Sequence, residues 1–323
     1  MIYEANEENI TKAATLIRNG DVVAFPTETV YGLGANAFNA EAVQKIFTIK
    51  ERPNFNPLIV HLTNVEQIES ISSYKENDRL IKLLQKVQHF WPGPLSVILP
   101  RKENIPTVVT GGLDTVAIRI PSHPIARALI NKCGYPIAAP SANKFTHISP
   151  TKAEHVEKSL GKDIFILDGG STTVGLESTV ITLVTNPPQL LRPGFVTFES
   201  LKLALGEIEH GAKTSDHPAS PGMIKRHYAP NTPLYFLDKV DLNSIPKNSA
   251  LISFGERELN DITKFSEVIY LSKNGNLEEV CANLFSSLYK LDNKGYEMIL
   301  IDSCSEDGLG LAIMDRISRA SEN

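Results

Sequence analysis

Residues 21–61 have the sequence DVVAFPTETVYGLGANAFNAEAVQKIFTIKERPNFNPLIVH, and this stretch contains the pattern that decides the fold. The apolar run 22–25 predicts a buried strand, and the amphipathic segment 40–48 predicts a short helix. Lys-Glu-Arg-Pro at 50–53 follows that helix and leads into a second predicted strand, 58–62. A strand followed by hydroxyls, glycines and two cations is typical of a phosphate-binding site.

The glycines of this stretch allow two interpretations. Residues 32–37, GLGANA, match G-x-G-x-x-[GA], the fingerprint of dinucleotide-binding folds. However, six residues separate Phe25 from Gly32, and the strand 58–62 continues into Thr63 without an acidic residue for a ribose. We therefore expect the glycines to allow a tight turn.

Apolar runs and amphipathic segments alternate up to about residue 208. Further strands are expected at 95–99, 115–120, 136–139, 164–168, 178–184 and 189–192, where β-branched residues are frequent. Further helices are expected at 8–18, 64–72, 78–90, 123–132, 151–160 and 197–205. Thr151 with Glu154 forms a capping-box pattern, and Asp78 is an expected N-cap. The mixture predicts an α/β or α+β domain built on one large sheet.

The rest of the chain predicts a linker and a second domain. Residues 209–232 are polar and rich in Pro and Gly, yet they contain the cluster Lys225, Arg226, His227, Tyr228. Beyond them, strands are expected at 233–237, 249–254, 266–271 and 297–302, and helices at 277–291 and 309–320. The expected division is a catalytic domain at 1–208, a linker at 209–232 and a small parallel α/β domain at 233–323.

Charge and cysteine content exclude some classes of protein. The net charge is −5, whereas a general nucleic-acid-binding protein is more often basic, so a polyanion site would be a local cluster of cations. Cys133, Cys281 and Cys304 include no C-x-x-C pair, which argues against a zinc site or a disulfide framework and favours the reducing cytosol. Neither a signal peptide nor a membrane-spanning stretch is expected.

Polar residues at the ends of apolar strands are candidates for the site. Lys50 and Arg52 could neutralise a polyphosphate, although cations and Pro also suit an ordinary helix end. Ser141 and Asn143 could share one face of extended backbone and bind a phosphate or ribose, although a strand-ending turn is the more common role of such a pair. Arg119, inside an apolar strand, requires an anion if it is buried, or else lies on a sheet edge.

Seven motifs occur together and in one order along the chain. They are PTETVYGLG at 26–34, KERP at 50–53, AIRIP at 117–121, PSAN at 140–143, ESTV at 177–180, LRPG at 191–194 and HYAP at 227–230. With them the chain resembles the YrdC-like family. With its C-terminal domain and the segment GLGLAIMDRI at 308–317, it resembles the long, two-domain L-threonylcarbamoyladenylate synthases of that family. The resemblance implies a twisted mixed sheet around a concave cationic cavity, followed by a small Rossmann-like domain.

The resemblance also implies a reaction. L-threonine, bicarbonate or CO2, and ATP would give threonylcarbamoyl-AMP and pyrophosphate, which makes the chain a nucleotidyltransferase. The product would pass to a separate transferase complex that modifies the adenosine next to the anticodon of tRNA, with a weak direct tRNA contact allowed. Mg²⁺ would be bound through the ATP phosphates, and no organic cofactor is expected.

Site residues follow from the same resemblance. The catalytic residues would be Lys50, Arg52, Ser141 and Asn143. The ATP site would add Asn56, Thr115, Ser149, Arg192 and Tyr228, and the threonine pocket would contain Thr29, His61, Arg119, Ala139 and Ser178. The HYAP motif suggests that residues 211–231 fold over the site as a lid. The alternatives are carbamoyl transfer from carbamoyl phosphate and a non-catalytic RNA-binding module.

Overall fold

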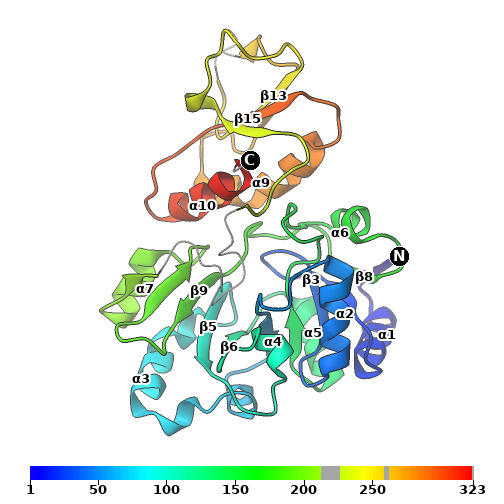
Figure 1. Cartoon of the computed structure of the whole chain (residues 1–323), viewed down its shortest axis with the longest axis vertical. Helices are drawn as coiled ribbons and strands as arrows, with labels where there is room; N and C mark the ends of the chain where they lie inside the picture. The colour runs from blue at the N-terminus through cyan, green and yellow to red at the C-terminus, as the bar shows by residue number, and fades with distance from the viewer. Residues whose placement is uncertain (212–225, 258–261, 322–323) are drawn as a thin grey trace.

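The computed structural model describes residues 1–211, 226–257 and 262–321, which form two β-sheets (Figure 1). The large sheet has eleven strands in the order β1-β8-β2-β3-β7-β4-β6-β5-β9-β10-β11, and the small sheet has four in the order β12-β15-β13-β14. In Figure 1 the small sheet lies at the top, with helices α9 (Leu277–Leu291) and α10 (Leu309–Ser321) on its side toward the large domain.

The elements have the following bounds. The large sheet contains β1 (Ile2–Glu4), β2 (Val23–Phe25), β3 (Gly32–Asn36), β4 (Ile59–His61), β5 (Leu95–Pro100), β6 (Thr115–Arg119), β7 (Ile137–Ala139), β8 (Phe165–Asp168), β9 (Thr179–Thr182), β10 (Gln189–Arg192) and β11 (Glu209–His210). The helices around it are α1 (Glu7–Arg18), α2 (Ala40–Lys50), α3 (Asp78–Val87), α4 (Thr107–Thr110), α5 (Pro124–Cys133), α6 (Ala153–Leu160) and α7 (Phe198–Leu205). The small sheet contains β12 (Leu234–Phe236), β13 (Ser249–Ser253), β14 (Glu267–Tyr270) and β15 (Met298–Ile301).

Alternating side chains divide the large domain into two cores. Ala24 and Ala138 point to one face and pack with α2 and α3, while Val23, Phe25 and Ile137 point to the other and pack with α1 and α5. On this second face α1 and α5 pack against β2, β7 and β8. Beyond these helices, Ile59 and His61 of β4 and Arg119 of β6 line a cavity on the same face.

Pairing around β4 brings functional side chains together on this open face. β4 is parallel to β6 and antiparallel to β7. The register places His61 opposite Arg119 and Ile59 opposite Ala139. Because directly paired residues point to the same face, all four side chains belong to one surface.

The sequence predictions were wrong at several points. Residues 32–36 form strand β3, which pairs with β2 and β7, where we expected a turn. A β-carbon at Gly34 would lie 2.6 Å from Ile137 Cγ2 and from Phe25 Cε1, so glycine here serves close packing within a sheet. The expected helix 64–72 contains a 3₁₀ helix, Glu66–Ser70.

Two expected helix caps were also wrong. The N-cap of α3 is Asn77, whose side chain accepts hydrogen bonds from the backbone N–H groups of Arg79 and Leu80, and Asp78 is the first helical residue. Helix α6 begins after Lys152, which makes no side-chain cap, and the Thr151 backbone N–H instead donates to Nδ1 of His155. Capping residues were therefore placed one position from their true site because helix ends depend on local backbone geometry.

The small domain is a parallel α/β unit, as expected. Each of its four strands pairs in parallel with its neighbour. Val280, Leu284 and Leu288 of α9 and Ile313 of α10 are buried in its core. Of the predicted linker, residues 209–210 form β11 at the edge of the large sheet, and 212–225 lie outside the described residues. The three-part domain division stays a prediction.

His155, which contacts α9 of the small domain, makes the free energy of unfolding depend on pH. Its ring stacks on that of Tyr289 on α9, with centroids 4.0 Å apart and an angle of 9° between planes. Burial, assisted by Lys152 and Lys158, lowers the pKa of His155 to about 4. Between this value and the usual histidine pKa of about 6.5, the unfolded chain binds more protons, so the free energy of unfolding falls as pH falls.

We expect His155→Gln to lose about 2 kcal/mol less stability than wild type between pH 7 and pH 5. Urea unfolding at the two pH values measures this difference. His89→Gln, at an exposed histidine, is the control and should keep the wild-type pH dependence. Equal losses in wild type and His155→Gln would show that His155 carries no part of the effect.

Candidate active site

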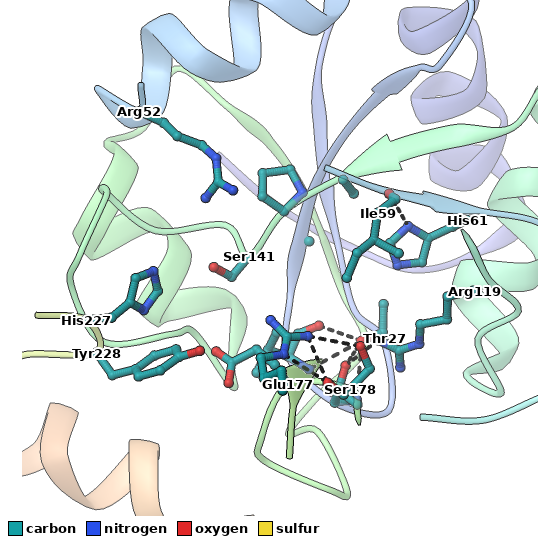
Figure 2. A pocket seen from close by; sticks show the side chains of 16 residues that line it. Thr27, Arg52, Ile59, His61, Arg119, Ser141, Glu177, Ser178, His227 and Tyr228 are labelled. Carbon is teal, nitrogen blue, oxygen red and sulfur yellow. Dashed lines mark hydrogen bonds between the residues drawn. The ribbon is translucent and has the colours of Figure 1, made fainter. Parts of the chain in front are cut away.

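A single cavity opens on the uncovered face of the large sheet (Figure 2). Its walls come from segments that are distant in sequence but meet at strand ends. They are Thr27, Thr29 and Val30 after β2, Gly32 of β3, Arg52 after α2, Ile59 and His61 of β4, Arg119 of β6, Ala139, Pro140 and Ser141 at the end of β7, Glu177 and Ser178 before β9, Arg192 of β10, and His227 and Tyr228. Figure 2 shows His61 and Arg119 at one end, and Arg52 and His227 at the other.

Arg119 organises the first end of the cavity. Its Nη1 donates to Oγ1 of Thr29 at 2.8 Å, and its Nη2 lies 2.7 Å from Oε1 of Glu28. Both side chains of the ion pair are buried. Burial alone would raise the pKa of Glu28, but the guanidinium outweighs it and the pKa is lowered. Arg119 is thus a fixed, partly neutralised cation with a hydroxyl beside it, an arrangement suited to a carboxylate.

His61 supplies a neutral group beside Arg119. One ring nitrogen, Nδ1, lies 3.1 Å from the carbonyl oxygen of Ile59, so we assign the proton to Nδ1 and a lone pair to Nε2. Burial, followed by the charge of Arg119, lowers the pKa of His61 to about 3. The ring is therefore uncharged near pH 7, and Nε2 can accept a hydrogen bond from a ligand.

The second end of the cavity is cationic. Lys50, Arg52 and Arg192 are all buried. Nζ of Lys50 donates to the carbonyl oxygens of Ser141, at 2.7 Å, and Asn143. Nη2 of Arg52 donates to the carbonyl oxygen of Pro57 at 3.0 Å. Neutral carbonyl oxygens thus orient the side chains of Lys50 and Arg52.

Directions of pKa shift show that the cations repel one another. Burial, followed by Arg52 and Lys144, lowers the pKa of Lys50 well below its usual value. Burial, followed by Arg192, lowers that of Arg52. A polyanion between these groups would relieve both the repulsion and part of the desolvation cost.

Buried polar atoms without a partner surround this end. Among the described residues, no hydrogen bond reaches the Tyr228 hydroxyl, Asn143 Oδ1 or either polar atom of the Asn56 side chain. Buried polar atoms nearly always have a partner. Their clustering beside Lys50 and Arg52 therefore indicates a place for a ligand or its water.

The structure brings the predicted site residues together to different degrees. All five residues predicted for the threonine pocket line the cavity: Thr29, His61, Arg119, Ala139 and Ser178. Of the residues predicted for ATP, Arg52, Ser141, Arg192 and Tyr228 line it. Lys50 and Asn143 lie directly behind Ser141, Asn56 lies beside Arg52, and Ser149 donates to the Glu177 carboxylate. Thr115 lies at the opposite end of β6 from Arg119.

Sequence reasoning missed two charged or titratable groups in the walls. Glu177 directly precedes Ser178 in ESTV, and His227 directly precedes Tyr228 in HYAP. Glu28 was missed although it stands inside the motif PTETVYGLG. Glu28, Glu177 and His227 all lie in motifs quoted above. The motifs did not show which cation would form an ion pair with each carboxylate. Of the predicted lid, His227 and Tyr228 reach the cavity, and 212–225 lie outside the described residues.

Comparisons with known proteins match both domains. A model of the Sua5, YciO and YrdC proteins, described as "Telomere recombination", matches residues 15–194, and one described as "Threonylcarbamoyl-AMP synthase, C-terminal domain" matches residues 196–322. The chain belongs to the threonylcarbamoyl-AMP synthase family. Relatives of that name from Pyrococcus abyssi and Bacillus subtilis are 45% and 42% identical over 98% of this chain and 94% of each relative.

Solved structures share the fold of the whole chain or of its large domain. P. abyssi Sua5 complexed with L-threonine is 43% identical, covers 99% of this chain and 96% of its own, and has a TM-score of 0.88. E. coli YciO is 23% identical, covers 58% of this chain and 90% of its own, and has a TM-score of 0.50, which shows a shared fold for the large domain alone. The resemblance seen in the sequence is therefore confirmed along the whole chain.

Polyphosphate binding should be accompanied by proton uptake. Tripolyphosphate beside Lys50 would raise the pKa of this lysine toward its usual value, so protons are bound at any pH between the free and bound values. Affinity should accordingly fall as pH rises through that window. Calorimetric titration in buffers of different ionisation enthalpy measures the uptake.

Lys50→Met should reduce this proton uptake. Lys45→Met, which removes an exposed lysine of the same helix, should leave it unchanged. Binding with no uptake in wild type, or with equal uptake in Lys50→Met, would show that Lys50 does not face the polyanion.

Proposed function

We propose that the chain catalyses the synthesis of threonylcarbamoyl-AMP and pyrophosphate from L-threonine, bicarbonate or CO2, and ATP. One observation carries this proposal: a single cavity joins an end suited to a carboxylate, formed by Arg119, Thr29 and His61, to an end with two buried arginines, Arg52 and Arg192, and Lys50 directly behind Ser141. Membership of the family and the threonine complex of its P. abyssi member support the identity of the substrates. The product would serve the threonylcarbamoyladenosine modification of tRNA.

The chemistry requires positioning and charge neutralisation. The threonine ammonium would lose one proton, and its nitrogen would attack the carbon of CO2, breaking a C=O π bond. Loss of a second proton from that nitrogen to solvent would give a carbamate. A carbamate oxygen would then attack the α-phosphorus of ATP, and the bond from that phosphorus to the bridging oxygen would break to release pyrophosphate. The step is an adenylyl transfer without a covalent enzyme intermediate, so fixed cations on both sides of the reacting phosphorus are the main contribution of the protein.

Roles for the cavity residues follow from their places. Arg119 would pair with the threonine carboxylate through the part of the guanidinium not engaged by Glu28, and the lone pair on His61 would accept from threonine. Lys50, Arg52 and Arg192 would neutralise the phosphates. Ser141 and Asn143 would position them, and Tyr228, Ser149 and Asn56 would complete the nucleotide end. Thr115 also belongs to the proposed ATP site, although it lies at the end of β6 opposite Arg119.

Mg²⁺ would accompany ATP. In the described ranges, no three or more His, Cys, Asp or Glu side chains gather to enclose a metal ion. Mg²⁺ retains water readily and is often held by substrate phosphates, and the cationic walls leave phosphate oxygens as its natural ligands here. Bound in this way, it would neutralise charge on the β- and γ-phosphates.

The product would leave for a separate transferase that acts on tRNA. No helix in the described ranges is long and apolar enough to cross a membrane. We propose a cytoplasmic protein, in keeping with three free cysteines and with a tRNA pathway. A direct contact with tRNA would be weak, because the net charge is −5.

The reaction is tested by following pyrophosphate in mixtures of protein, ATP, Mg²⁺ and bicarbonate. We expect release only when L-threonine is present, with threonylcarbamoyl-AMP detected by mass spectrometry. Replacing ATP and bicarbonate by carbamoyl phosphate should give no threonine-derived product. Threonine-independent release, or activity with carbamoyl phosphate, would contradict the proposal.

Arg119→Lys should raise the KM for threonine by about 10- to 100-fold and leave the KM for ATP within about twofold, because an ammonium cannot contact Glu28, Thr29 and a carboxylate at once. Arg79→Lys is a matched control, since Arg79 binds the carbonyl oxygens of Leu183 and Thr185 away from the cavity. Steady-state kinetics with each substrate varied in turn measures both constants. An unchanged KM for threonine would remove Arg119 from the threonine pocket.

A further inference from the structure

One arginine of the small domain reaches the walls of the cavity in the large domain. Arg316, on α10, is 0% exposed and is among the largest fully buried side chains of the described residues. Its Nε donates to Oε2 of Glu177 at 2.8 Å, and its Nη2 donates to the carbonyl oxygen of Pro193 at 3.0 Å. Glu177 lines the cavity, and Pro193 directly follows Arg192, which also lines it.

The same guanidinium supports Tyr228. Its central carbon lies 5.2 Å from the centroid of the tyrosine ring, and the ring also stacks on Phe285 of α9, with centroids 5.6 Å apart. Tyr228 has a φ of 64°, which is unfavourable for a residue with a side chain. The His227 backbone N–H donates to the carbonyl oxygen of Arg319, also on α10. Contacts from the small domain therefore hold this backbone in its uncommon conformation.

Glu177 links Arg316 to a further residue of the large domain, Ser149. While one carboxylate oxygen accepts from Arg316, the other accepts from the Ser149 hydroxyl. The Tyr228 hydroxyl points toward Glu177 in Figure 2. A single side chain thus sets the places of three groups at the nucleotide end: Glu177, Ser149 and Tyr228.

The charge of Arg316 is balanced by neighbouring carboxylates, and this pairing fixes the position of its guanidinium. A buried guanidinium is costly unless it is paired and hydrogen-bonded, and Arg316 meets two carboxylates, those of Glu177 and Asp315. Glu177 lines the same cavity as Arg52 and Arg192, but both of its carboxylate oxygens are engaged, one by Arg316 and one by Ser149. Without Arg316, the carboxylate would be free to turn toward those cations and to occupy the anion site.

We propose that Arg316 is a positioning residue through which the small domain shapes the nucleotide end of the catalytic cavity. It orients Glu177 and fixes the Tyr228 ring, so that the cations of the large domain stay available to ATP. The inference rests on the proposed function, because it assigns ATP to that end. It gives the small domain a direct part in the reaction, and it predicts an effect on ATP that spares threonine.

The test compares Arg316→Met, which keeps side-chain length without charge, with Arg316→Lys. We expect Arg316→Met to weaken binding of a non-hydrolysable ATP analogue at least about tenfold by calorimetry. In kinetics, its KM for ATP should rise by a similar factor, while its KM for threonine stays within about twofold. Arg316→Lys should recover only part of the loss, because an ammonium cannot bind Glu177 and the Pro193 carbonyl as a planar fork does.

A control separates this role from a general loss of stability. Arg257→Met removes a partly buried ion pair with Asp302 inside the small domain, and it should leave the KM values for ATP and threonine unchanged. If Arg316→Met alone fails to fold, the double variant Arg316→Met/Glu177→Gln removes both charges of the pair and should fold. We expect it to keep the weakened analogue binding, because neither replacement side chain fixes Tyr228.

The outcomes distinguish the two proposals. Wild-type turnover combined with wild-type analogue binding by Arg316→Met, or by the double variant, would overturn the role of Arg316 and leave the proposed function intact. A wild-type protein that releases no pyrophosphate, but whose analogue binding still depends on Arg316, would overturn the function alone. Equal rises in KM for ATP and threonine would show a structural role and would also overturn the inference.

Discussion

The burial of like charges is the constraint on which the rest of the site depends. Lys50, Arg52 and Arg192 are buried in the protein, where desolvation, followed by repulsion from nearby cations, lowers the pKa of each. Such an arrangement costs folding free energy, and the fold bears it because backbone carbonyls orient the side chains of Lys50 and Arg52. An anionic ligand would recover that cost as binding energy. Charge that is pre-positioned but not neutralised is also what an adenylyl transfer requires.

The mixed sheet determines where the two ends of the cavity meet. Parallel pairing of β4 with β6 sets His61 opposite Arg119, and antiparallel pairing of β4 with β7 brings Ala139 and the following Ser141 to the same face. Helices α1 and α5 pack on the neighbouring part of this face and leave the rest to the cavity. An amino acid and a nucleotide can therefore be bound on one continuous surface, with their reacting groups adjacent.

Two buried carboxylates form ion pairs with arginines, one at each end of the cavity. Glu28 is paired with Arg119, and Glu177 is paired with Arg316 from the small domain. Each carboxylate orients an arginine or is oriented by one, so neither competes freely with the ligand. The small domain, which adds its own parallel sheet and core, thereby contacts two residues that line the cavity, Glu177 and Tyr228, through Arg316.

The sequence by itself determined the α/β class, most strand and helix positions, and the motifs that contain all walls of the cavity except Ile59, His61 and Ala139. Local periodicity and β-branched content decide these features, and they act over a few residues. Only the tertiary structure decided that residues 32–36 are a strand, because Gly34 is required by the approach of Phe25 and Ile137. It alone joined Glu28 to Arg119 and Glu177 to Arg316, pairs separated by many residues in the chain. Such pairings depend on sheet register and on domain contact, which no local pattern encodes.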